Sequence, residues 1–207
     1  NQNPDGPVYP TPTIGMVGLL DNVNRKMTMD FKAPGDLIFL VGISRADINS
    51  SEYLHKIRGI EFSPAPHFDL EEEFTLHQKI SELIDYKLIE SAHDVSEGGL
   101  FVALIESCFH RNLGIDVVAS DYKIRKDGYW FGEAQSRVVV SVKNSKLATF
   151  KKYIAGHPYE ELGEVTPGSI EVDGMNWGSI HAWKEKYDNA ITELLAGQES
   201  EEALSAL

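Results

Sequence analysis

The sequence predicts an α+β fold in which helices pack against a mixed β-sheet. Short apolar runs of strand length and longer stretches of helical periodicity follow one another along the 207 residues, without the strict alternation that a parallel α/β sheet requires. One run, LIFLVG (37–42), is apolar throughout, which is typical of a strand buried on both faces. With 42% hydrophobic and 25% charged residues, the chain is long enough for one globular domain with an appended segment.

The N-terminal segment is expected to be extended. Residues 1–13 are polar and carry four prolines, which favours an extended segment without a core of its own. TIGMVGLL (13–20) is apolar with two glycines, which is typical of a buried strand that other backbone approaches closely. APGD (33–36) then predicts a turn into the buried strand at 37–42.

Two helices are predicted after that strand. The first begins at the serine pair 50–51 and stops at Gly59. The second lies within 68–88 and has the strongest signal in the chain, because Asp69 is a natural N-cap and three glutamates follow in the first turn. Its apolar face is expected to comprise Leu70, Phe74, His77, Ile80 with Leu76, Leu83 and Ile84. His77 is therefore expected to be a core or boundary residue and not a ligand.

Strands and helices of ordinary length are predicted for the remainder of the chain. Strands are expected at 114–119, 136–142, 159–166 and 169–174, and helices at 100–113, 145–155 and 178–197. The Pro167-Gly168 turn predicts that the last two strands form a hairpin. The apolar face of the last helix is expected to comprise Ile180, Trp183, Tyr187, Ile191 and Leu194. The charged tail 198–207 is expected to be frayed.

The charge balance and the single cysteine exclude several classes of function. A formal net charge of -13 argues against a broad nucleic-acid interface, which requires a basic face. No apolar run is long enough to span a membrane, and the N-terminus lacks the features of a signal peptide. Cys108 is expected to be a small buried residue of a helix, and one cysteine cannot form a disulfide framework. These features predict a cytoplasmic protein that binds neither nucleic acid nor membrane.

The stretch HDVSEGGL (93–100) is the strongest candidate for a binding site. Two adjacent glycines that enter a helix present free N–H groups to an anion, and the helix dipole adds positive potential. The candidate phosphate- or substrate-binding residues are His93, Asp94, Ser96, Gly98 and Gly99, with Asp94 able to hold Mg²⁺ and His93 able to donate or accept a proton. The pattern fits equally well a plain strand-to-helix turn that Asp94 or Ser96 caps.

A second, weaker candidate is the polar start of the strand FGEAQSRVVVSV (131–142). Glu133, Gln135 and Arg137 alternate, so an extended backbone would place all three on one face, where they would suit a polar small molecule. The alternative is a solvated strand entry in which Arg137 pairs with Glu133. Histidines and acids elsewhere lack metal-ligand spacing, so no catalytic residue and no metal ligand is assigned.

Three stretches, in the same order along the chain, resemble one enzyme family. They are YPTPTIGMVGLLDNV (9–23), SAHDVSEGGLFVALIE (91–106) and FGEAQSRVVVSV (131–142), and LGEVTPGSIEV (162–172) with the helix after it also fits. They are similar to the C-terminal part of the large subunit of phosphoribosylformylglycinamidine synthase. That resemblance implies an ATP-dependent ligase of de novo purine biosynthesis, which converts formylglycinamide ribonucleotide to formylglycinamidine ribonucleotide with ammonia derived from glutamine.

The resemblance also implies a domain organisation. The family is built from a duplicated two-domain unit, shared with aminoimidazole ribonucleotide synthetase, selenophosphate synthetase and thiamin-monophosphate kinase. Residues 34–197 then correspond to a C-terminal-type domain of that superfamily, and residues 1–33 to the tail of a preceding ATP-binding-type domain. The family's catalytic histidine and its main ATP and Mg²⁺ ligands lie upstream of this chain. ATP and Mg²⁺ are thus expected as cofactors of the full-length enzyme, with none assigned to this fragment.

The same resemblance predicts partners and an inactive fragment. The expected partners are the missing N-terminal part of the enzyme and a glutaminase subunit or domain, with a homodimer through the exposed strand at 13–20 as a further expectation. Two departures from the family are present: Ala134 replaces the serine of a Glu-Ser-Gln pattern, and INSSEYL (48–54) lacks the usual glycine pair. The alternatives are a cyclo-ligase or kinase of the same superfamily, or a non-catalytic docking domain.

Overall fold

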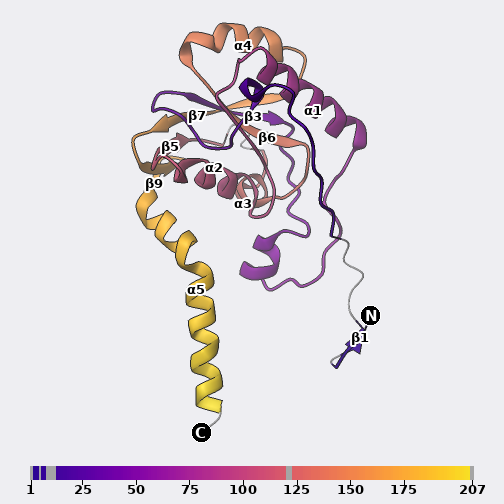
Figure 1. Ribbon diagram of the computed structural model, residues 1–207, viewed down its shortest axis with the longest axis vertical. Helices are drawn as coiled ribbons and strands as arrows, with labels where there is room; N and C mark the ends of the chain where they lie inside the picture. The colour runs from indigo at the N-terminus through magenta and orange to yellow at the C-terminus, as the bar shows by residue number, and fades with distance from the viewer. Residues whose placement is uncertain (1, 5, 8–12, 120–122, 206–207) are drawn as a thin grey trace.

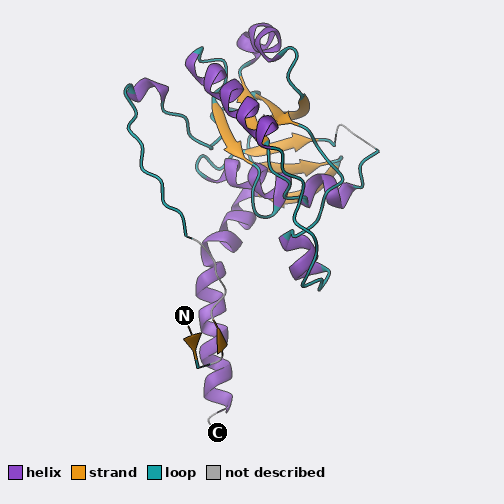
Figure 2. Cartoon of the chain, turned by 90° about the vertical axis from the view of Figure 1, so that its right-hand side faces the viewer, coloured by secondary structure: helices purple, strands orange, loops and turns teal. Residues whose placement is uncertain are grey.

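A computed structural model describes residues 2–4, 6–7, 13–119 and 123–205 and has three layers. Seven strands form one sheet in the order β4-β6-β3-β7-β5-β8-β9. Helices α1 and α4 cover one face, and α2 and α3 cover the other (Figures 1 and 2). All neighbouring strands are antiparallel except β5 and β8, which are parallel, so the predicted α+β fold with a mixed sheet is confirmed.

The sheet and its helices have the following bounds. The strands are β3 (Leu37–Gly42), β4 (Ser91–Asp94), β5 (Gly114–Val117), β6 (Arg137–Val142), β7 (Tyr159–Thr166), β8 (Ser169–Val172) and β9 (Met175–Ser179). The α-helices are α1 (Leu70–Asp85), α2 (Gly99–Phe109), α3 (Lys126–Phe131), α4 (Leu147–Ile154) and α5 (Ile180–Ser205). Short turns of helix are η1 (Val23–Arg25), η2 (Tyr53–Ile57) and η3 (Asn144–Lys146), and β1 (Gln2–Asn3) pairs with β2 (Gly6–Pro7) apart from the main sheet.

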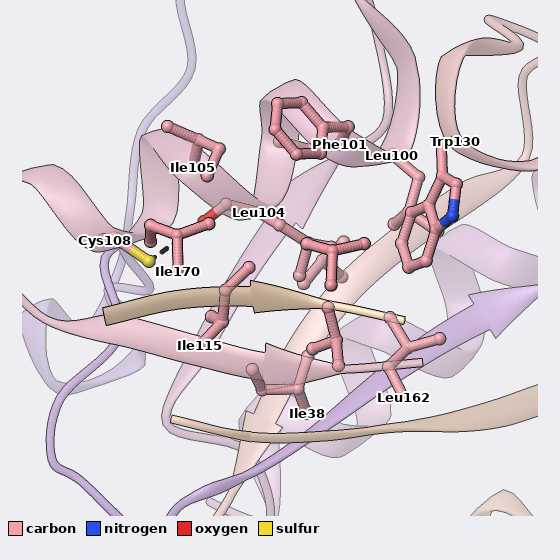
Figure 3. Close-up of a cluster of buried hydrophobic side chains, with 14 of the residues drawn as sticks. Ile38, Leu100, Phe101, Leu104, Ile105, Cys108, Ile115, Trp130, Leu162 and Ile170 are labelled. Atoms are coloured by element: carbon pink, nitrogen blue, oxygen red, sulfur yellow. Dashed lines mark hydrogen bonds between the residues drawn. The ribbon is translucent and has the colours of Figure 1, made fainter. Parts of the chain in front are cut away.

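Strand β3 is buried on both faces, as its apolar run predicts. Ile38 and Leu40 belong to the core on the α2 side, whereas Phe39 and Val41 belong to the core on the α1 and α4 side. Figure 3 shows the α2 side, where the helix lays its apolar residues over the strands. Cys108 is fully buried there, as predicted, and burial raises the pKa of its thiol to about 12.

Helix α1 begins where the sequence indicates, but it buries a different face. The Asp69 carboxylate accepts hydrogen bonds from the amides of Glu71 and Glu72, which confirms the predicted N-cap. The buried residues of the helix are Leu76 and Leu83, while Leu70 and Phe74 are exposed. The expectation that His77 lies at the core is wrong, because its ring is 68% exposed and pairs with Glu73. Several stripes in this helix have helical spacing, and only packing against the sheet selects one.

The predicted hairpin between residues 159–166 and 169–174 is also wrong. Strand β5 lies between β7 and β8, antiparallel to the first and parallel to the second. Strand β8 instead forms a hairpin with β9, a strand that the sequence analysis missed. Asp173 and Gly174 form the turn with positive φ at both positions (53° and 73°), the conformation for which Asp-Gly turns are favoured.

Three other segments also differ from expectation. Residues 13–20 form no strand, and their side chains are exposed, with Val17 at 102%, because no described strand pairs with them. Helix α5 buries Ile180 but leaves Tyr187, Ile191 and Leu194 exposed, since the helix extends beyond the sheet (Figure 1). The helix expected from residue 50 to Gly59 is reduced to the π-helical turn η2.

The segment 26–32 is held against the domain. The amide of Ala92 at the sheet edge donates to the carbonyl of Thr28 (3.2 Å), and the amide of Phe31 donates to the carbonyl of Ser107 on α2 (2.8 Å). The Phe31 side chain is fully buried in the core on the α2 side. Residues 24–32, called the lead-in below, therefore form part of the surface on that side of the domain.

The registers define two ends of the sheet. At the Gly42 end, β3 and β4 finish and β6 begins, since Gly42 pairs with Arg137 and Asp94 pairs with Val138. At the Leu37 end, β3 and β4 begin and β6 finishes. Helices α1 and α2 each follow a segment that leaves the Gly42 end, so both begin near the Gly42 end and finish near the Leu37 end.

Candidate functional site

The turn between β4 and α2 lies at the Gly42 end and requires both of its glycines. Gly98 and Gly99 have φ of 80° and 72°, a left-handed conformation that side chains with a Cβ rarely adopt. A Cβ at Gly98 would lie 2.3 Å from the Val102 side chain, and a Cβ at Gly99 would lie 2.8 Å from the Gly132 carbonyl oxygen. Backbone conformation and packing thus demand glycine here, independently of any ligand.

The N-terminus of α2 is occupied by a carboxylate of the same chain. Glu133 Oε1 accepts from the amide of Gly98 (2.9 Å) and from the amide of Glu52 (2.8 Å). The amide of Gly99 donates to the carbonyl of Ser96 (3.0 Å). The helix dipole favours a negative charge at this position. The Glu133 carboxylate therefore takes the place that the sequence pattern predicted for a bound anion.

The His93 ring is held against α2 by Glu106, a residue that the sequence analysis missed. The ring is 10% exposed, with Nε2 3.1 Å from Glu106 Oε2 and Nδ1 3.5 Å from Asp94 Oδ1. Asp94 is 79% exposed, and Ser96 is exposed as well. No local pattern marks Glu106, because it lies 13 residues after His93 on the next element. The structure therefore brings His93, Asp94 and Glu106 together at the surface.

The second candidate set, Glu133, Gln135 and Arg137, does not lie on one face of a strand. Ser136 has a φ of 61°, which interrupts the extended backbone that the alternation argument assumed. Glu133 is bound to the α2 turn, Gln135 points to solvent, and Arg137 is 3% exposed. The expected shared polar face is therefore wrong.

Arg137 is buried and binds backbone carbonyls, and it does not pair with Glu133. Its guanidinium donates to the carbonyls of Ala134 (Nε, 3.1 Å) and Gly132 (Nη2, 2.6 Å), which fixes the loop before β6. Burial lowers the pKa of Arg137 to about 10, against the opposing charge of Glu160. The residue thus remains protonated at neutral pH.

A cavity of about 310 Å³ lies at the same end, on the α1 side of the sheet. Its lining includes Gly42, Ser136 and His157, with Asp69, Glu71 and Glu72 from the start of α1. Burial, with Lys79 nearby, lowers the pKa of His157. Within residues 13–119 and 123–196, no group of three or more His, Cys, Asp or Glu side chains is arranged to hold a metal ion. The acidic lining makes this cavity unsuited to phosphate.

The fold is similar to that of known structures. It is similar to PurL of T. maritima complexed with FGAR, with a TM-score of 0.61 at 17% identity over 77% of this chain and 29% of that chain. It is also similar to the hydrogenase maturation protein HypE in complex with ATP, with a TM-score of 0.54 at 13% identity over 76% of this chain and 54% of that one. At these identities the likeness concerns the fold.

The sequence comparisons identify the family. Residues 33–174 match the family described as AIR synthase related protein, C-terminal domain, and the chain belongs to that family. It is 37% identical over 174 residues to phosphoribosylformylglycinamidine synthase subunit PurL of Alkaliphilus metalliredigens, covering 83% of this chain and 23% of that protein. The PurL subunit of Leuconostoc mesenteroides is 40% identical over 166 residues, covering 80% of this chain and 22% of that protein.

These comparisons confirm the resemblance to phosphoribosylformylglycinamidine synthase that the motifs predicted. The chain spans about a quarter of the length of the curated relatives that it matches. Among the described residues, no helix is both long enough and apolar enough to cross a membrane.

Proposed function

We propose that this chain is a C-terminal-type domain of an ATP-dependent carbon–nitrogen ligase, which converts formylglycinamide ribonucleotide to formylglycinamidine ribonucleotide in purine biosynthesis. The observation that carries the proposal is the 37% identity to a PurL subunit across 83% of the chain, together with the family match. Residues 34–197 form the C-terminal-type domain, and residues 1–33 are the tail of a preceding ATP-binding-type domain. The enzyme acts in the cytoplasm.

The chain alone is proposed to be inactive. ATP and Mg²⁺ are proposed to bind other parts of the enzyme, because the glycine-rich helix start at 96–99 is already bonded to Glu133. One such turn cannot position ATP, an amide and ammonia together. The partners that complete the reaction are the missing N-terminal part and a glutaminase that supplies ammonia.

The test is to assay the purified chain for ATP- and ammonia-dependent formation of the amidine product, alone and after the upstream part of the enzyme is added. We expect no turnover alone and measurable turnover in the reconstituted enzyme. Turnover by the chain alone would contradict the proposed inactivity. Failure of the reconstituted enzyme, with an authentic synthase active in parallel, would contradict the proposed function.

Within the intact enzyme, we propose that the β4–α2 turn faces the substrate or nucleotide. His93, Asp94, Ser96, Gly98 and Gly99 belong to that side, and Glu133 fixes the turn. Arg137 holds the loop that carries Glu133, and Gln135 is exposed in the same loop. The exposure of Asp94 and Ser96 supports this orientation.

Asp94→Asn in the full-length enzyme tests that orientation, because the exposed carboxylate can be neutralised without loss of packing. We expect a raised KM for one substrate and an unchanged melting temperature. Asp188→Asn on α5 is the control, since it makes the same charge change on an exposed residue far from the turn. Equal, unaltered kinetics for both variants would show that the turn is structural only.

A further inference from the structure

A second cavity, of about 510 Å³, lies at the Leu37 end of the sheet. Four separate segments form its walls: the lead-in at 24–32, the connection from α1 to β4, the end of α2, and η3. It is thus at the opposite end of β4 from the proposed substrate-facing turn. The volume is within the range of about 300–1,000 Å³ that is usual for small-molecule sites.

The lining of this cavity is basic in an acidic chain. The cations are Lys26, Lys32, Lys87, Arg111 and Lys146, against the two carboxylates Asp30 and Glu90. The formal charge of the lining is therefore five minus two, or +3, whereas the whole chain carries -13. Five of the 19 lysines and arginines are gathered here, which produces a local positive potential.

Both carboxylates are already engaged within the protein. Asp30 pairs with Lys32 (3.0 Å) and with Arg111 Nε (3.1 Å). Glu90 pairs with Lys146 (2.6 Å) and with Lys143 (3.0 Å). Burial alone would raise the pKa of Glu90, but the hydrogen bonds from these lysines outweigh it and lower the pKa.

Two of the cations have no internal partner. Across residues 13–119 and 123–196, neither Lys26 nor Lys87 donates to an acceptor through its ammonium group. Lys26 comes from the lead-in and Lys87 from the connection after α1, so they approach the cavity from different elements. Both therefore have their charge available to a ligand.

Stabilisation of the helix ends does not account for all of this charge. Helices α1 and α2 both finish here, and each C-terminus carries roughly half a negative charge. Two helix ends together offset roughly one of the three surplus cations. Lys146 does donate to the carbonyl of Lys87 after α1 (2.7 Å), yet Lys26 and Lys87 themselves make no such bond. A surplus of roughly two positive charges remains for an external anion.

We infer that this cavity binds a small, multiply charged anion with more than one phosphate group. A diphosphate suits the surplus charge, the volume and the lysine ammonium groups, which act as point charges and tolerate varied phosphate geometry. No Phe, Tyr or Trp of the described residues lines the cavity, so it offers no platform for stacking a nucleobase. Because the lead-in forms one wall, the anion would also tie that segment to the domain.

The test is calorimetric titration of the 207-residue chain with pyrophosphate at low and at physiological salt. We expect saturable binding of one equivalent that weakens as salt is raised. Lys26→Gln with Lys87→Gln should weaken that binding by about tenfold or more, because two charge-assisted contacts are lost while no internal bond is broken. Circular dichroism confirms that the double variant is folded.

The matched control is Lys56→Gln with Lys152→Gln, which removes the same charge from two exposed lysines that do not line the cavity. This control should bind pyrophosphate as the unmodified chain does. An equal loss in both double variants would show that only net charge matters and would overturn the site, as would an absence of saturable binding. ATP that binds much more tightly than pyrophosphate at this site would also overturn the inference, because it would require recognition of the base.

Discussion

The two ends of the sheet carry opposite charge although they belong to one small domain. At the Gly42 end, where α1 and α2 begin, the helix starts are met by the carboxylates of Asp69 and Glu133. At the Leu37 end, where the same helices finish, Lys87, Arg111 and Lys146 surround a cavity. This is the distribution that helix dipoles favour.

The difference shows where an acidic chain can accept an anion. A glycine-rich helix start is a suitable anion site only while its N–H groups are free, and here Glu133 has taken the first of them. At the Leu37 end, by contrast, the cavity lining contains more cations than carboxylates, so positive charge is available to an anion. The glycine-rich motif therefore predicts an anion site at the Gly42 end, whereas the surplus positive charge lies at the Leu37 end.

The largest effect is expected from Gly99→Ala at the Gly42 end. The new Cβ would meet the backbone of Phe131 and Gly132 at 2.8 Å, and the residue would remain left-handed, so we expect a loss of about 3 kcal/mol in the free energy of unfolding. Gly156→Ala is the control, with a φ of 84° but open space around it, and should cost about 1 kcal/mol. Equal losses in urea denaturation would show that close packing of the turn is unimportant.

Glu133→Ala should have the next largest effect, about 2 kcal/mol, because the amides of Gly98 and Glu52 lose their acceptor. Glu133→Gln keeps an acceptor oxygen and should cost less. Phosphate should then raise the melting temperature of the alanine variant more than that of the unmodified chain, since the freed helix start becomes an anion site. If phosphate stabilises both chains to the same extent, Glu133 is not what occupies this position.

At the Leu37 end, Glu90→Gln should cost about 1 kcal/mol at neutral pH through the lost pairing with Lys143 and Lys146. The lowered pKa of Glu90 means that its contribution is present above the ordinary pKa of a glutamate and disappears as pH falls through the folded-state pKa. The difference between variant and unmodified chain should therefore shrink below about pH 4. A difference that is constant with pH would contradict the assigned ion pairs.

Asp36→Asn should give the smallest effect and the opposite sign. Burial, with the negative charge of Glu90 nearby, raises the pKa of Asp36, and its Oδ2 lacks a partner among the described residues. Ionisation thus opposes folding as pH rises through the unfolded and then the folded pKa. Relative to the unmodified chain, the variant should become more stable between pH 4 and pH 7, as followed by thermal unfolding at each pH. A relative loss across that range would show that Asp36 is stabilised as the anion.

The spacing of residues along the sequence predicted much of the fold but little of the candidate site. The apolar run at 37–42, the strand at 159–166 and the Asp69 cap each depend on neighbours one to four residues away, and all three appear as predicted. The burial of Cys108 follows from the helix that carries it. Three ordered motifs also predicted the family, because they preserve a pattern along the chain that does not depend on knowing the fold.

Tertiary structure alone decided what lies next to what. The insertion of β5 between β7 and β8, the choice of Leu76 and Leu83 as the buried face of α1, and the exposure of residues 13–20 all depend on contacts distant in sequence. Likewise, Glu133 reaches Gly98 across 35 residues, and the basic cavity joins four segments. Periodicity determines which residues can share a face, but the free energy of packing distant segments selects the face and the neighbours, and hence the charge that each end of the sheet presents.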